Sequence, residues 1–215
     1  MIVKTILEHV KNQFESDTSG HDWFHIERVY KIACHLHTKE GGDLEIIQLS
    51  ALLHDISDHK MNGGKLNDGG NVALQLLIQN GYNEEKAIIV ANIVDGVSFK
   101  GALVKDQQIS IEGKIVQDAD RLDAIGAMGI ARAFAYGGSK NRPIYEPAVL
   151  PELHDDFKKY ATAKSHTINH FYEKLLLLKD RLHTKTAQVI GLKRHQLMEE
   201  FLEQFYDEWN LTNLD

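Results

Sequence analysis

The doublet His54-Asp55 places two side chains that can bind a metal ion directly after the apolar helical run at residues 49–53. Such neighbours are unusual on a helix whose other residues are typical of a buried core. Two further segments, residues 21–29 and 118–123, also combine histidine or aspartate with apolar residues. A histidine, then a His-Asp doublet, then an aspartate is the order of ligands in a mononuclear metal site built by three separate helices.

The four candidate metal ligands are His25, His54, Asp55 and Asp120. Imidazole nitrogens and carboxylate oxygens together suit a divalent ion such as Mn²⁺, Fe²⁺, Co²⁺, Ni²⁺ or Zn²⁺. On an octahedral ion, four protein ligands would leave two positions for water or substrate oxygens. Because neighbouring residues project about 100° apart on a helix, the doublet can reach one ion only near a groove between helices.

The residues that share a helical face with these candidates indicate that the ligands point inward. His25 lies on one face with Val29 and Ile32, and Asp120 lies on one face with Val116. Polar groups on such apolar faces are costly unless they are paired or bound to a metal. Any one of them alone would more often be a hydrogen-bonded core residue or a cap. Their number and order favour the metal site.

Composition limits the other classes of function. The chain of 215 residues can bury one substantial core, and no apolar run approaches a membrane-spanning length. The N-terminus does not resemble a secretory signal, and the single Cys34 fits a reducing compartment, so we expect a cytoplasmic protein. The net charge of −7 argues against a nucleic-acid-binding surface.

The remaining pattern is helical almost throughout, and the three prolines all lie between residues 143 and 151. Asp22 and Asp43 are the expected N-caps of two helices. We expect helices at residues 2–15, 22–41, 43–55, 71–79, 84–94, 118–135, 164–182 and 184–209, an ambiguous stretch at 97–110 and an irregular one at 136–162. The prediction is an all-α, single-domain bundle over residues 1–215, with the metal-site helices within about 20–125 and the C-terminal helices at about 164–209.

These segments resemble the HD-domain superfamily of metal-dependent phosphohydrolases, which is named for the His-Asp doublet. The resemblance is carried by residues 20–29, 51–56 and 113–123, while residues 168–175 and the last helix are similar to a narrower branch of small single-domain bacterial proteins. The resemblance implies an all-α fold, a divalent ion held by the four candidate ligands, and hydrolysis of phosphate esters or anhydrides. Within the narrower branch, the implied reaction converts a nucleoside triphosphate to a monophosphate and pyrophosphate.

One metal ion is expected. Dinuclear HD proteins need additional histidine ligands between the doublet and the last aspartate, and only His59 lies in that interval. We favour Mn²⁺, with Fe²⁺, Co²⁺, Ni²⁺, Zn²⁺ or Mg²⁺ as alternatives.

Phosphate hydrolysis also requires an activated water and cations that neutralise the phosphates. Asp58, one helical turn beyond Asp55, is the candidate base, although family members often carry a carboxylate pair here and Ser57 takes its first position. The alternative for Asp58 is a solvated carboxylate at a helix end.

Arg28 and Lys174 are the candidate catalytic cations, and Arg121 and His170 are candidate substrate contacts. Arg28 and Arg121 could instead form ion pairs behind the metal ligands. Lys174 and His170, four residues apart on an expected helix, could instead lie on a solvated surface.

Three further side chains are candidate substrate contacts. Lys60 and Lys65 lie beside paired glycines and could close over a polyphosphate. Asp123 faces the same way as Asp120 and could bind a ribose hydroxyl or support the ligands, or pair with an arginine.

The leading hypothesis is therefore a metal-dependent phosphohydrolase whose partner is a small nucleotide or phosphate ester, with no nucleic acid and no membrane. The alternatives are a phosphomonoesterase, a cyclic-nucleotide phosphodiesterase, or a nucleotide-sensing protein with little turnover. The identity of the product separates them. The two long C-terminal helices offer a surface for a homodimer.

Overall fold

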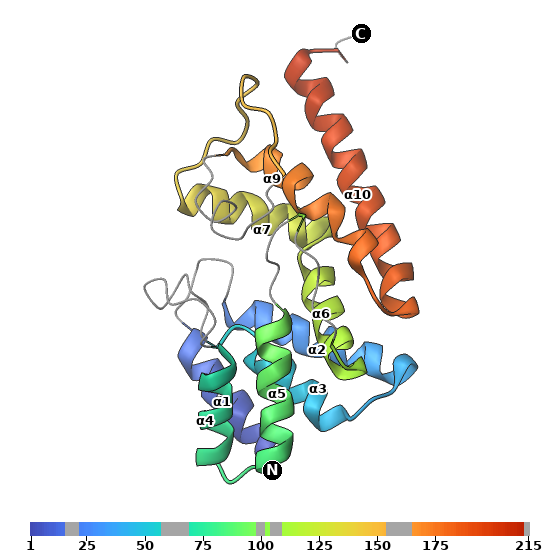
Figure 1. The fold of residues 1–215 in the computed structure, drawn as a ribbon. Coiled ribbons are helices and arrows are strands. Elements are labelled where there is room, and N and C mark those ends of the chain that lie inside the picture. Colours follow the sequence, from blue (N-terminus) through green and yellow to red (C-terminus); the bar gives the residue numbers. More distant parts are fainter. Residues whose placement is uncertain (16–21, 57–68, 98–101, 104–108, 154–164, 213–215) are drawn as a thin grey trace.

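The computed structural model describes residues 1–15, 22–56, 69–97, 102–103, 109–153 and 165–212. Within these ranges every regular element is a helix and no strand occurs, which confirms the all-α prediction. Figure 1 shows α1 to α5 gathered toward one end of the molecule and α7, α9 and most of α10 toward the other, with α6 between them. None of the described helices is long and apolar enough to cross a membrane.

The elements follow one another with short connections. They are α1 (Ile2–Phe14), α2 (Trp23–Glu40), α3 (Leu44–Leu53), α4 (Gly69–Gln79), α5 (Glu84–Val97), α6 (Ile111–Asp123), α7 (Gly126–Ser139), α9 (Thr167–Glu173), the 3₁₀ turns η1 (Leu175–Leu177) and η2 (Lys179–Arg181), and α10 (Lys185–Asn210).

The predicted N-caps begin the helices that carry the candidate ligands. The Asp22 side chain accepts a hydrogen bond from the His25 backbone N–H at the start of α2, and Asp43 caps α3 in the same way. α2 packs against both α3 and α6. Fully buried side chains such as Ile26, Leu52 and Leu122 fill the space between them, so one core holds the three helices in place.

The single helix expected at residues 118–135 is wrong. α6 ends at Asp123, and α7 begins at Gly126, whose φ of +75° cannot continue a right-handed helix. A Cβ atom at Gly126 would lie 3.0 Å from the Cβ and Cγ atoms of Arg194 in α10. Glycine therefore allows both the turn and the close approach of α10.

The helix expected at residues 164–182 is also wrong, because the short α9 is followed by the two 3₁₀ turns. Leu175 and Leu178 are buried with the three-residue spacing of a 3₁₀ turn. The chain then reaches Asp118 in α6, whose carboxylate accepts hydrogen bonds of 2.8 Å from the backbone N–H groups of His183 and Thr184. These contacts place Thr184 as the N-cap of α10, as a straight helix to residue 182 would not.

Candidate metal centre

The four candidate ligands come from three helices that pack together. His25 lies in the first turn of α2, and Asp120 lies in the last turn of α6. His54 and Asp55 follow the last residue of α3 in a turn, where the Ile56 N–H donates to the Leu53 carbonyl oxygen. The doublet is therefore displayed at a helix end, where adjacent side chains can turn toward one point.

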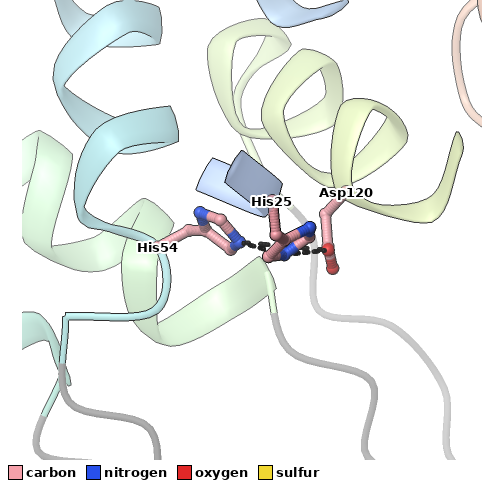
Figure 2. A group of neighbouring side chains, drawn as sticks. All are labelled: His25, His54 and Asp120. Carbon is pink, nitrogen blue, oxygen red and sulfur yellow. Dashed lines mark hydrogen bonds and ion pairs between the residues drawn. The ribbon is translucent and has the colours of Figure 1, made fainter. Parts of the chain in front are cut away.

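Figure 2 shows His25, His54 and Asp120 pointing toward one another. The Nε2 atoms of the two histidines are 3.2 Å apart, and the Asp120 Oδ1 atom is 3.6 Å from that of His25 and 3.9 Å from that of His54. The Asp55 Oδ2 atom is 3.5 Å from both nitrogens. The side chains that the sequence marks as ligands thus meet in one place.

The hydrogen-bond partners of the histidines define where the ring hydrogens lie. His25 Nδ1 is 2.7 Å from Asp123 Oδ2, and His54 Nδ1 is 2.8 Å from the Ala51 carbonyl oxygen. A carboxylate and a carbonyl can only accept, so each Nδ1 carries the hydrogen. In the neutral ring, each Nε2 therefore turns its lone pair toward the other ring and toward the two carboxylates.

This cluster consists of acceptors that cannot donate to one another, which is unfavourable unless a positive charge lies among them. The ionisation of His25 reports the same field. Burial opposes its protonation, but hydrogen bonds to Asp123 and Asp55 outweigh burial and raise the pKa of the ring. The residues therefore fit a divalent cation, and their nitrogen and oxygen atoms suit one such as Mn²⁺.

Asp123 lies behind the ligands, at the end of α6, and is 1% exposed. Besides His25, its carboxylate accepts hydrogen bonds from Arg28 Nε at 2.7 Å, from Arg28 Nη2 at 3.1 Å and from Arg132 Nη1 at 2.9 Å. Burial alone would raise the pKa of this carboxyl, but the hydrogen bonds from His25 and Arg28 hold the pKa well below its usual range. Asp123 is thus an ionised group surrounded by donors.

The other candidates differ in where they lie. Arg28 pairs with Asp123 rather than with one of the four candidate ligands. Arg121 donates to the Arg181 carbonyl oxygen and lies 3.3 Å from His183 Nε2, so these contacts are with the segment before α10.

His170 lies in α9, but Lys174 is the residue after that helix, with φ of −142°. The shared helical face on which this pair was predicted therefore does not extend to Lys174. Asp58, Lys60 and Lys65 lie outside the described residues.

Arg132 is the contact that sequence reasoning missed. On one continuous helix, the nine residues from Asp123 to Arg132 would place the two on opposite faces, about 180° apart. The break before Gly126 redirects α7 and brings the guanidinium back to the carboxylate. A glycine within an otherwise helical pattern was the only available signal.

Comparison with known proteins agrees with this geometry. The HD domain family matches residues 23–125. Bacillus subtilis YpgQ is 40% identical over 197 residues, which cover 91% of this chain and 87% of YpgQ.

Solved structures extend the likeness to nearly the whole chain. One from Lactobacillus plantarum has a TM-score of 0.86 at 35% identity and covers 97% of both chains. YpgQ in complex with ADP has a TM-score of 0.74 at 34% identity and covers 99% of this chain and 100% of its own. An HD-superfamily hydrolase from Bacillus thuringiensis has a TM-score of 0.73 at 42% identity, with 97% and 96% covered. The chain described here therefore belongs to the HD domain family.

Proposed function

We propose that this protein is a divalent-metal-dependent phosphohydrolase that converts a nucleoside triphosphate to a monophosphate and pyrophosphate. The observation that carries the proposal is the convergence of two histidine lone pairs and two carboxylates in a chain of the HD domain family. The complex of YpgQ with ADP supports a nucleotide as the ligand, because that relative resembles this chain over its whole length.

His25, His54, Asp55 and Asp120 would hold the ion. When bound, a divalent ion supplies a Lewis acid for a phosphate oxygen and makes water a better nucleophile. The carboxylate side chains of Asp120 and Asp55 are 30% and 15% exposed, whereas that of His25 is 1% exposed. A phosphate would therefore approach from the side of the two carboxylates, with the histidines forming the closed side.

The chain's own residues would supply the remaining requirements. Asp58, three residues after Asp55, is the proposed base that orients or deprotonates the attacking water. Arg28 is 30% exposed and remains a candidate to neutralise a phosphate beside its pair with Asp123. The other proposed cations are Lys174, His170, Lys60, Lys65 and Arg121.

The test is product analysis by ³¹P NMR, with metal-free protein, added Mn²⁺ and a mixture of nucleoside triphosphates. Wild-type protein is expected to release pyrophosphate and monophosphate, and Asp120→Ala is expected to release neither. Asp180→Ala, which removes an aspartate whose side chain is 79% exposed on η2, should retain wild-type turnover.

Each other product pattern has a definite meaning. Orthophosphate as the only inorganic product would replace the proposal with a phosphatase. Saturable nucleotide binding without turnover would replace it with a binding protein. Turnover that survives in Asp120→Ala would contradict the proposed metal centre.

A further inference from the structure

We infer that Asp123 is a positioning residue of the metal centre, which fixes the orientation and the tautomer of His25 so that its Nε2 lone pair faces the ion. The inference rests on the proposed metal centre and goes beyond it, because Asp123 is not one of the four ligands. It also reassigns a residue whose sequence context suggested contact with substrate.

The first step concerns the direction of the hydrogen bonds. All four contacts of Asp123 come from donors: His25 Nδ1, Nε and Nη2 of Arg28, and Nη1 of Arg132. The carboxylate is buried, and its oxygens are already used by these partners. It has no position from which to reach a ribose hydroxyl.

The second step concerns what Asp123 does to His25. A neutral imidazole carries its hydrogen on only one nitrogen, and the partner of one nitrogen decides what the other can do. At 2.7 Å, Asp123 Oδ2 keeps the hydrogen on Nδ1. The Nε2 atom, 3.2 Å from His54 Nε2 and 3.6 Å from Asp120 Oδ1, is thereby kept as an acceptor.

The third step concerns how Asp123 is itself held. Arg28 lies one turn after His25 on α2, and its two-nitrogen fork fixes the plane of the carboxylate. Arg132 reaches the same carboxylate from α7. One aspartate at the end of α6 thus joins three helices and transmits their relative positions to a single histidine ring.

These contacts predict the effect of a change that removes only the charge. In Asp123→Asn, the amide NH₂ must face either Arg28 Nε or the group formed by His25 Nδ1 and the other two donors. If it faces His25, the ring must accept at Nδ1 and carry its hydrogen on Nε2, where it cannot bind a metal. If it faces Arg28, two donors meet and the clamp on the carboxylate plane is lost.

The experiment compares Asp123→Asn with Asp118→Asn, a matched control on the same helix. Asp118 is also buried and also accepts three hydrogen bonds, but from His183 and Thr184 rather than from His25. Both variants should lose thermal stability. In calorimetric titrations of metal-free protein with Mn²⁺, we expect about 10- to 100-fold weaker binding for Asp123→Asn and wild-type affinity for Asp118→Asn.

The tautomer provides a second readout that does not depend on turnover. NMR of metal-free protein with ¹⁵N-labelled histidine, at a pH where the ring is neutral, should show the His25 hydrogen on Nδ1 in the wild type and on Nε2 in Asp123→Asn. If Asp123→Asn does not fold, the wild-type spectrum alone decides.

The outcomes separate this inference from the proposed function. Wild-type Mn²⁺ affinity in folded Asp123→Asn, equal losses in both variants, or a hydrogen on Nε2 in the wild type would overturn the inference and leave the metal centre standing. A wild-type protein that binds no Mn²⁺ would overturn both.

Discussion

Three aspartates of α6 lie within six residues and have three different environments. Asp118 is buried on the side that faces the start of α10, Asp120 is partly exposed among the candidate ligands, and Asp123 is buried behind them. Burial raises the pKa of Asp118 despite its hydrogen bonds, whereas His25 and the arginines keep that of Asp123 low. Charge partners rather than burial alone therefore decide which buried carboxyl is ionised most readily.

The lowered pKa of Asp123 predicts how the metal-free protein responds to acid. A carboxyl whose pKa is depressed on folding stabilises the fold above its unfolded pKa of about 3.9 and loses that contribution as the pH falls below it. Urea unfolding at a series of pH values between about 7 and 3 should therefore show a smaller loss of free energy of unfolding for Asp123→Asn than for the wild type. Parallel pH curves for the two proteins would contradict the assignment of Asp123 as an ionised hub.

At the scale of elements, the break between α6 and α7 determines which residues of the two helices can meet. Gly126 is the hinge of this break, with φ of +75° and Arg194 close to the place of a Cβ atom. Replacing it with alanine should destabilise the protein, by about 1–3 kcal/mol, because both the backbone and the contact with α10 become strained. The measurement is the free energy of unfolding in urea.

Gly138, near the end of α7, is the matched control for that change. It has no atom within 4 Å of the place of its Cβ atom and is helical. Gly138→Ala should be neutral or stabilising by up to about 1 kcal/mol. A Gly126→Ala protein as stable as Gly138→Ala would show that the break tolerates a side chain.

How much of these elements was predictable depends on whether the signal was local. The caps at Asp22 and Asp43 and the gathering of the candidate ligands follow from residue types and spacing, and the structure confirms both. The break at Gly126 and the 3₁₀ turns after α9 depend on contacts with α10 and Asp118, which are distant in sequence. The roles of Arg28, Lys174 and the other candidate cations stay predictions.

At the scale of the whole molecule, the metal centre exists only when the chain is folded. Its candidate ligands span residues 25 to 120 and are brought together by packing of α2, α3 and α6. In the unfolded chain these side chains are far apart, so an ion that needs all of them binds the folded state selectively. Metal binding and global stability are therefore linked.

This linkage predicts a thermal shift that is independent of turnover. Mn²⁺ at about 100 times its dissociation constant should add about 2.7 kcal/mol to the free energy of unfolding. For a chain of this length, that corresponds to a rise in Tm of roughly 5–10 °C. His54→Ala, which removes one ring from the cluster, should show little rise at the same Mn²⁺ concentration, while Asp180→Ala should follow the wild type. An equal rise in His54→Ala and the wild type would mean that Mn²⁺ stabilises the protein from somewhere other than the three-helix centre, and the site would have to be sought elsewhere.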